Sequence, residues 1–324
     1  MSSHPMPAYR LQSDGLDVEI LAVGASVRSI AMAGVAVPLI LGALDRDVYG
    51  PRNRSFLGAT VGRHANRIAG ARFALAGEEH RLSVNEPPHH LHGGATGLWA
   101  KTWTLLDRGE RHLVLGVVSP DGDDGYPGRA NVEAHFSLEE AGALSIAYRG
   151  TCDRPSPLNI APHFYFNLSG RPSARDHVLT IAADAYLPVD ETLIPTGEIR
   201  DVAGSRFDFR GGRRIDEGPA LLDHCFCLAG GRTLEPRPVL TLSCDTSEIS
   251  IGLETTEAGV QVYDGSSFDG SFRGLDGTAI GPYGGIAIEP QGWPDAPNRP
   301  NFPSPIVHPG EAYIHRSRFR FTRP

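Results

Sequence analysis

Apolar and polar residues alternate with a two-residue period in one segment of this chain after another. The clearest segment is 131–138, NVEAHFSL, in which every second residue is apolar. The turn 139–142 separates it from 144–148, LSIAY, and this arrangement predicts a hairpin. Alternation of this kind is typical of strands that bury one face. It also predicts strands at 16–20, 178–181, 239–243, 249–253, 260–263 and 316–321.

Glycine and proline determine how often the chain must turn. The sequence has 38 glycines and 26 prolines, together 64 of 324 residues, and they are scattered rather than clustered. No long stretch repeats apolar residues at helical spacing, and no linker, repeat or low-complexity segment divides the chain. We therefore predict an all-β protein with few short helices. Its single domain, residues 1–324, is expected to be one large antiparallel β-sandwich.

Composition limits the partners and the compartment. The net charge of −8 has no basic block to offset it, which argues against nucleic acid and anionic membranes as partners. The apolar run from Val35 to Leu44 is too short to span a bilayer, so we expect one or two sandwich strands there. The first 15 residues show no secretory signal. We expect a cytoplasmic protein whose cysteines are buried free thiols, namely Cys152, Cys225, Cys227 and Cys244.

A glutamate lies between an apolar run and a proline-rich loop, in 285–304, GIAIEPQGWPDAPNRPNFPS. The run 285–288 indicates the end of a buried strand, and because proline cannot donate to a ladder we expect the strand to end before Pro290. Trp293, Phe302 and the prolines can desolvate Glu289 and raise its pKa, which suits a general base. A surface carboxylate at a strand end is the alternative.

Four further stretches interrupt the alternation with polar residues. The segment 58–70, GATVGRHANRIAG, offers Arg and Asn, which are suited to reading hydroxyl groups, although one arginine could be structural. The segment 85–94, NEPPHHLHGG, has three histidines, but no acidic or cysteine ligand is placed to complete a metal site. In 156–170, SPLNIAPHFYFNLSG, His163 lies among aromatics and could be a core histidine. The fourth stretch is 222–228, LDHCFCL.

These stretches together resemble the signature segments of the aldose 1-epimerase (galactose mutarotase) family. The matching pieces occur in the family's order: GATVGRHANRIAG, NEPPHHLHGG with GLWAKTW, DGYPG, SPLNIAPHFYFNLSG, LDHCFCL, VQVYDG and IAIEPQGWPDAPNRPNFPS. The resemblance implies a β-supersandwich whose open groove binds a free monosaccharide, with no metal or organic cofactor. It also implies an isomerase that interconverts the α and β anomers of an aldose such as galactose or glucose.

The resemblance also implies roles for individual residues. Glu289 matches the general base that takes the proton of the C1 hydroxyl, and His163 matches the acid that protonates the ring oxygen. A partly desolvated Glu and a His near its ordinary pKa suit this pairing. The positions that match sugar contacts are His92, Arg67, Asn66, Asp223 and Gln261. Of these, His92 and Arg67 are also expected to stabilise charge near the ring oxygen.

Phe164, Tyr165, Trp293 and Tyr126 are candidates for stacking on the sugar, but most such residues pack in cores, so we expect at most one or two of them to do so. Three positions depart from the family's pattern. Pro162 replaces a more usual Asn before the histidine, so one supporting amide is missing. Phe164 stands where a small polar residue is more usual and could narrow the pocket. Cys225 stands where Asn is frequent.

Three other functions are weighed against the mutarotase. A hexose-6-phosphate mutarotase would need basic residues at the groove rim, which Arg171, Arg175 or Arg299 could supply. A non-catalytic sugar-binding or regulatory protein would not need both Glu289 and His163. A lyase or glycosidase would need a longer groove, and a glycosidase a second carboxylate motif, which the sequence lacks. The expected partner is a monosaccharide, an aldohexose or aldopentose, for a monomer or homodimer. The sequence does not determine the preferred sugar.

Overall fold

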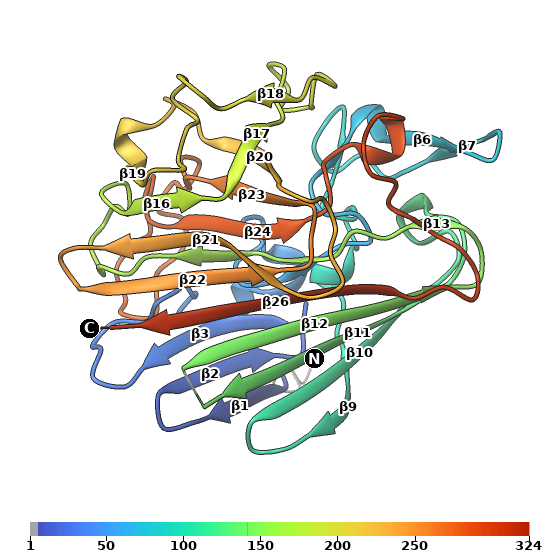
Figure 1. The fold of residues 1–324 in the computed structure, drawn as a ribbon. Coiled ribbons are helices and arrows are strands. Elements are labelled where there is room, and N and C mark those ends of the chain that lie inside the picture. Colours follow the sequence, from blue (N-terminus) through green and yellow to red (C-terminus); the bar gives the residue numbers. More distant parts are fainter. Residues whose placement is uncertain (1–5, 141, 324) are drawn as a thin grey trace.

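The computed structural model describes residues 6–140 and 142–323, and strands dominate it (Figure 1). All strand pairings between named strands are antiparallel in this part of the chain. Helical structure in the described residues is confined to three-residue 3-10 turns: η1 (Arg46–Val48), η2 (Gly50–Arg52), η3 (Ala69–Ala71), η4 (Leu98–Ala100), η5 (Asp123–Gly125), η6 (Ile215–Glu217) and η7 (Ala296–Asn298). None of the described helices is long and apolar enough to cross a membrane. The predicted all-β class with few short helices is confirmed.

The larger sheet has nine strands, and it contains most of the segments that alternate in sequence. Its long central strands lie side by side in Figure 1. The order is β19 (Arg213–Arg214), β16 (Val178–Ile181), β21 (Arg237–Cys244), β22 (Ile249–Thr255), β26 (Tyr313–Thr322), β12 (Ala143–Cys152), β11 (Ala130–Glu139), β10 (His112–Ser119) and β9 (Thr104–Arg108). The predicted hairpin is β11–β12, with Phe136 opposite Ile146, and the burial of β11 alternates along its length.

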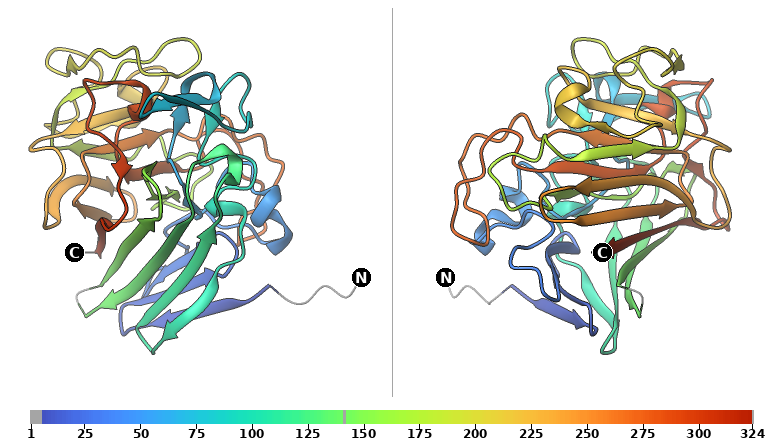
Figure 2. Two further views of the ribbon diagram at one scale, coloured as in Figure 1. Left: turned by 90° about the vertical axis from the view of Figure 1, so that its right-hand side faces the viewer. Right: turned by 60° about the vertical axis from the view of Figure 1, so that its left-hand side comes forward.

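A second sheet has six strands, and a third has three. The six-stranded order is β15 (Phe164–Phe166), β24 (Ile286–Gln291), β23 (Gly259–Tyr263), β20 (Asp223–Leu228), β17 (Ala183–Tyr186) and β18 (Arg200–Asp201). The three-stranded sheet is β1 (Ala8–Gln12), β2 (Leu16–Leu21) and β3 (Ser26–Met32), which lies beside the β10–β12 end of the large sheet (Figure 2).

Four two-stranded ribbons connect the sheets and carry much of the polar sequence. They are β4 (Thr60–Val61) with β14 (Ala161–Pro162), β5 (Arg67–Ile68) with β8 (His90–Leu91), β6 (Arg72–Leu75) with β7 (Glu78–Arg81), and β13 (Ser156–Pro157) with β25 (Ile306–Val307). The pair β4–β14 joins the 58–70 segment to the segment that precedes His163, and the pair β5–β8 joins it to the segment that precedes His92.

One apolar cluster fills the space between the sheets. It takes Val18 from the three-stranded sheet, Ile288 from the six-stranded sheet and Phe319 from the nine-stranded sheet, all at most 1% exposed. Its members run from Leu11 to Phe321, so segments from both ends of the described chain pack together. Burial of this much apolar side-chain surface is the main term that stabilises the sandwich.

Two strand predictions are wrong. Residues 35–44 form no strand: only Ile40 and Ala43 make isolated bridges, because Pro38 and Gly42 interrupt any ladder. Strand β24 does not end before Pro290 but continues to Gln291. Since β15 pairs with β24 only as far as Ile288, Pro290 lies where the strand has a neighbour on one side, and a proline is tolerated there.

The six-stranded sheet has a second face, which does not touch the main core. Along β24, Ile286 and Ile288 enter the main cluster, whereas Ala287 joins a separate one. Along β23, Val260 and Val262 also enter the main cluster. The two-residue period therefore directs the alternate side chains of these strands, Gln261 and Glu289 among them, to the outer face.

A buried histidine in the 58–70 segment has two ring nitrogens that lack a hydrogen-bond partner among the described residues. His64 is 0% exposed, and neither ring nitrogen is paired within the described protein atoms. Burial lowers the pKa of His64 to about 3. A neutral imidazole without partners packs as an apolar group, but unfolding exposes it to water and to protons.

We predict that His64 makes the fold sensitive to acid. The unfolded chain binds a proton at His64 below its ordinary pKa of 6.5, whereas the folded chain does not until about pH 3, so stability falls as pH drops through this window. Between pH 7 and 5 the loss is about 2 kcal/mol for one such histidine. Urea unfolding of wild type and His64→Val at both pH values measures it. An equal pH dependence for the two proteins contradicts the prediction.

Candidate active site

Three of the predicted site residues stand on the outer face of the six-stranded sheet. Gln261 of β23 is directly opposite Glu289 of β24, and Asp223 begins the neighbouring strand β20. The Nε2 of Gln261 donates to the Oδ1 of Asp223 at 2.5 Å. Side chains of directly opposed residues are neighbours across an antiparallel ladder, so the sheet itself brings these groups together.

His163 approaches Glu289 from the junction between β14 and β15. Its backbone N–H donates to Ala59 O at 2.9 Å, and its carbonyl accepts from Gly58 N at 3.0 Å, which fixes the backbone. The Nε2 of His163 lies 3.5 Å from the Oε1 of Glu289. The two residues are 3% and 2% exposed, so the pair is almost fully removed from water.

His92 enters the same site from the loop after β8. The N–H of Asn66 donates to the Nδ1 of His92 at 3.1 Å, and the His92 and His163 rings meet edge to face at 5.1 Å. Gly93 permits this approach: its φ is +86°, and a Cβ there would lie 1.7 Å from the carbonyl oxygen of Gly62. Only glycine can occupy that position.

The hydrogen bond from Asn66 also fixes the tautomer of His92. A ring nitrogen that accepts a hydrogen bond carries no proton, so in the neutral ring the proton is on Nε2. His92 therefore presents a hydrogen-bond donor to the site. Asn66 itself is 3% exposed, and its side-chain Oδ1 accepts from the N–H of Arg67 at 2.8 Å.

The same tautomer opposes a metal centre. Ligand atoms of His92, His163 and Glu289 lie within 4.8 Å of one another, which is a spacing that a divalent ion could use. A histidine ligand, however, normally donates a hydrogen bond from its other ring nitrogen. The Nδ1 of His92 faces the N–H of Asn66. Metal binding at Nε2 would move the ring proton to Nδ1, where it would clash with the hydrogen of that N–H. The donor set fits proton transfer better than ligation.

Arg67 is placed between two carboxylates. Its Nε and Nη2 donate to the two oxygens of Glu86 at 2.7 and 2.9 Å, and its Nη1 lies 3.5 Å from the Oδ2 of Asp223. Its side chain is 9% exposed. Glu86 was not among the residues predicted from the sequence, although it stands beside a proline pair in the matched segment NEPPHHLHGG.

Burial shifts the pKa values of Glu289 and His163 in opposite directions. It raises the pKa of Glu289 well above the ordinary value; the charge of Asp223 adds to the rise, and that of Arg67 opposes it. Burial lowers the pKa of His163 to about 3, so the expectation of a histidine near its ordinary pKa is wrong for the ligand-free protein. Burial likewise lowers the pKa of His92 well below its ordinary value.

Polar atoms of the site lack partners within the described protein. Among them are Glu289 Oε2, His163 Nδ1 and Gln261 Oε1, each buried. Buried polar groups are normally hydrogen-bonded, and their concentration around one pair of acid–base groups marks a place where a polar ligand supplies the missing bonds. The unpaired Nδ1 of His163 is consistent with the missing amide expected from Pro162.

An aromatic residue that sequence reasoning missed contacts both histidines. The ring of Phe56 lies 4.5 Å from that of His92, 5.8 Å from His163 and 5.1 Å from Trp99. It is half-buried, and its backbone φ is +55°. Nothing in its local sequence, PRNRSFLG, signals this position, because the loop reaches the site only through tertiary packing.

The predicted stacking aromatics mostly belong to cores. Tyr165 packs on His163 at 5.0 Å, whereas Phe164 and Tyr126 are buried in separate apolar clusters. The Nε1 of Trp293 donates to Ala258 O. The idea that Phe164 narrows the pocket is wrong, because its side chain points into the main core against Phe319.

The remaining polar candidates are placed elsewhere or already paired. His90 bonds Ser83 O and the Tyr126 hydroxyl, and His89 accepts from Gly70 N, so the three neighbouring histidines diverge. The four cysteines are free and buried, as expected, and Cys225 is opposite Gln261 in the sheet. Of the rim arginines, Arg171 pairs with Asp176, Arg299 pairs with Asp295, and Arg175 covers the Tyr283 ring.

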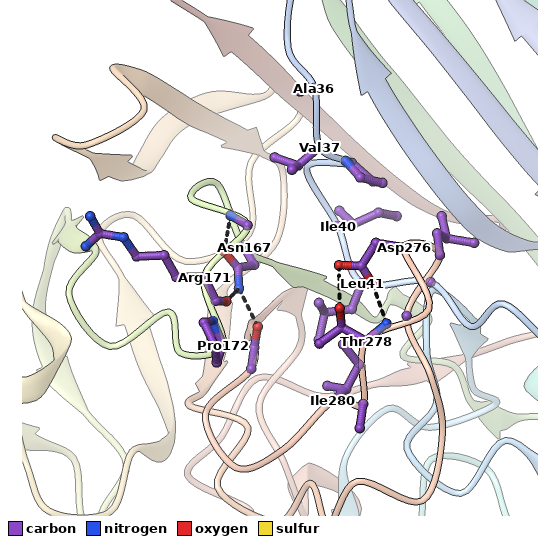
Figure 3. Close-up of a pocket in the computed structure, with 17 residues that line it drawn as sticks. Ala36, Val37, Ile40, Leu41, Asn167, Arg171, Pro172, Asp276, Thr278 and Ile280 are labelled. Carbon is purple, nitrogen blue, oxygen red and sulfur yellow. Dashed lines mark hydrogen bonds between the residues drawn. The ribbon is translucent and has the colours of Figure 1, made fainter.

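A separate hollow of about 290 Å³ lies away from this chemistry (Figure 3). Val37, Ile40, Leu41 and Ile280 give it an apolar lining, and none of the predicted site residues lines it. The amide of Asn167, which faces it, already donates to Arg171 O and Gly284 O.

The fold and the site place the chain among the galactose mutarotase-like β-sandwiches. A crystal structure of a GalM/aldose epimerase homologue from C. elegans matches with a TM-score of 0.92 and 28% identity, covering 98% of this chain and 99% of that one. A galactose 1-epimerase from Lactobacillus acidophilus matches with a TM-score of 0.86 and 28% identity, covering 99% and 96%.

Sequence comparison defines the family. The family model described as aldose 1-epimerase matches residues 7–320. A galactose mutarotase of Mus musculus is 39% identical over 328 residues, 97% of this chain and 93% of that protein. An aldose 1-epimerase of Escherichia coli K12 is 34% identical over 333 residues, 97% and 95% of the two chains. The chain belongs to the aldose 1-epimerase family.

The shifted pKa values predict the pH profile of kcat/KM, which reports groups of the free enzyme. In the predicted roles of Glu289 and His163, the two residues together hold one proton. Because the pKa of His163 is about 3, no second proton binds between pH 7 and 5, and kcat/KM should stay level there. It should fall when rising pH passes the raised pKa of Glu289 and the pair loses its proton. Initial rates from pH 5 to 9 check this; a decline from pH 7 to 5 would place the pKa of His163 near its ordinary value.

Proposed function

We propose that this protein is an aldose 1-epimerase that interconverts the α and β anomers of a free aldose, with Glu289 as general base and His163 as general acid. The observation that supports this most directly is the buried contact of 3.5 Å between the Nε2 of His163 and the Oε1 of Glu289. Each residue also has one buried polar atom without a hydrogen-bond partner among the described protein atoms. Membership of the family agrees with the reaction.

In the proposed reaction, the carboxylate of Glu289 takes the proton of the C1 hydroxyl while the imidazolium of His163 gives a proton to the ring oxygen. The C1–O5 bond breaks, and the electron pair of the former O–H bond forms the aldehyde C=O. Rotation about C1–C2 presents the other face of the aldehyde. Reclosure returns both protons, so the enzyme ends in its starting state. Each transfer contributes about 10²–10⁴-fold.

The reactive proton arrangement is a minor form of the ligand-free site. Burial favours neutral groups, so the single proton of the pair rests on Glu289, opposite a neutral His163. The short distance between the two side chains allows the proton to move to the histidine when the substrate's hydroxyl groups bind them. Coupled groups of this kind titrate as a pair rather than singly.

The other predicted residues are assigned to sugar binding. His92 Nε2–H and Arg67 are donors that can stabilise charge developing at the ring oxygen. Asp223 and Gln261 offer acceptors, and Asn66 fixes His92 through its backbone. We assign none of these described residues to a cofactor. We propose that a dialysed, chelator-treated sample keeps its activity, and polarimetry before and after treatment tests this; restoration of a lost rate by an added divalent ion would contradict it.

Two finer points belong to the same proposal. The sugar-phosphate alternative is less favoured, because the basic residues that it would use at the rim are paired or stacked. We keep the cytoplasmic location as a proposal supported by four free, buried cysteines. We propose that the protein is a monomer or a homodimer. Rates measured with a panel of aldoses identify the preferred sugar.

We predict that Glu289→Gln abolishes mutarotation without unfolding the protein. The amide keeps the shape of the side chain but cannot accept the C1 proton, so kcat should fall by about 10²-fold or more. Polarimetry on freshly dissolved α-D-galactose and α-D-glucose, with wild type alongside, measures the rate. Retention of more than about a tenth of wild-type kcat would remove Glu289 from the role of base.

Replacement of the acid and of a binding residue should separate kcat from KM. His163→Asn should lower kcat in the same way, because the ring oxygen loses its proton donor. Asp223→Asn should mainly raise KM, since it weakens binding contacts while Glu289 and His163 are both kept. The lost charge of Asp223 also lowers the pKa of Glu289, which should move the alkaline limb of the pH profile to lower pH. Michaelis curves for both variants decide this. A reversed pattern would show that the acid has been misassigned.

A further inference from the structure

A glutamate outside the predicted set holds the guanidinium of Arg67. Both carboxylate oxygens of Glu86 are engaged, with the Nε and Nη2 of Arg67 at 2.7 and 2.9 Å. Such two-point contacts are stronger and more directional than single hydrogen bonds between neutral groups. The arginine side chain is 9% exposed and the glutamate 37%, so the contact joins a buried cation to the rim of the site.

This contact determines which edge of the guanidinium faces Asp223. With Nε and Nη2 held by Glu86, the Nη1 is left on the side of Asp223, whose Oδ2 is 3.5 Å away. Asp223 in turn accepts from Gln261. The row Glu86–Arg67–Asp223–Gln261 therefore joins the loop of Glu86 and strand β5 to two strands of the six-stranded sheet.

We propose that Glu86 is a positioning residue for the sugar site: it orients Arg67 so that Nη1 faces Asp223 and the substrate. The inference rests on the proposed function and adds to it a residue that does not itself touch the reacting atoms. The carboxylate acts through Arg67, and its effect is on both sugar binding and the rate of ring opening.

The loop that carries Glu86 is built to hold it still. Asn85 bonds Leu91 through both its side-chain atoms, at 2.9 and 2.8 Å. The backbones of Glu86 and His89 bond each other in both directions, at 3.2 and 2.6 Å. Leu91 also pairs with Arg67 in the β5–β8 ladder, and His92 follows directly. One rigid turn thus positions both the glutamate and a site histidine.

Without Glu86, the guanidinium of Arg67 would be free to turn toward the two carboxylates that remain nearby. Asp223 and Glu289 both interact electrostatically with this arginine. An arginine that turned toward Glu289 would favour its charged form and lower its pKa, whereas one that turned toward Asp223 would compete with the sugar. Either movement weakens catalysis by displacing a group from its productive position.

The test compares Glu86→Gln and Glu86→Ala with a matched control. Glu79→Gln removes a glutamate of β7 that pairs with Arg81 at 2.7 Å, is 46% exposed and lies outside the site. We expect kcat/KM for galactose to fall about tenfold in Glu86→Gln and about a hundredfold in Glu86→Ala, and not in the control. The alkaline limb of the pH profile should move to lower pH in the Glu86 variants.

Circular dichroism and melting curves check that the variants fold. If Glu86→Ala does not fold, the inference is judged from the isosteric Glu86→Gln alone.

A double-mutant cycle with Arg67→Lys tests whether the effect passes through the guanidinium. Lysine keeps the charge but has no fork, so Glu86→Gln should cost less than about twofold in that background. Equal losses in both backgrounds, or a Glu86→Gln enzyme that matches Glu79→Gln, would overturn the inference. If wild-type protein turns over neither galactose nor glucose, the proposed function is overturned. In that case the affinities of wild type and the Glu86 variants for galactose, measured by calorimetry, show whether Glu86 positions the site. If wild type does not bind galactose, both proposals are overturned.

Discussion

Burial of the Glu289 carboxylate is the constraint on which the site depends. Strand β24 has no face open to water: Ile286 and Ile288 fill the main core, and Glu289 on the opposite face is 2% exposed. A lone carboxylate in such a place is strongly destabilising unless it is protonated or has partners. Here the burial of the carboxylate and the charge of the neighbouring Asp223 raise the pKa of Glu289 and so favour its protonated form. His163 lies close enough to receive this proton. The raised pKa of Glu289, the residue that we propose as general base, follows from its burial in the sheet.

The groups around this carboxylate come from loops that are tied to one another. The β4–β14 pair sets the segment that carries Asn66 and Arg67 beside the segment that carries His163, and β5–β8 joins it to the loop of His92. Backbone hydrogen bonds to His163 and the close approach at Gly93 remove most of the remaining freedom. Catalytic groups must be held within a fraction of an ångström of their productive positions, and short ribbons achieve this better than free loops.

Charge is distributed so that the site can bind a neutral, hydroxyl-rich ligand. Arg67 is held by Glu86 and faces Asp223, and the acid–base pair shares one proton. His92 contributes a donor whose tautomer is fixed by a backbone N–H. Donors and acceptors of both kinds therefore line one buried corner, and the basic side chains at the rim are engaged elsewhere.

Much of this protein was determined by local sequence. Two-residue alternation predicted six of the nine strands of the large sheet, because the pattern decides which face of a strand is buried, whereas β9, β10 and β19 were not predicted. The order of the motifs defined the family. Where packing competes with local preference, sequence reasoning failed: Pro290 is inside a strand because β15 ends before it, and Phe164 turns into the core. Only the tertiary structure decided that Phe56 and Glu86 reach the site and that His163 is neutral, because these depend on contacts between segments distant in the chain and on the exclusion of water.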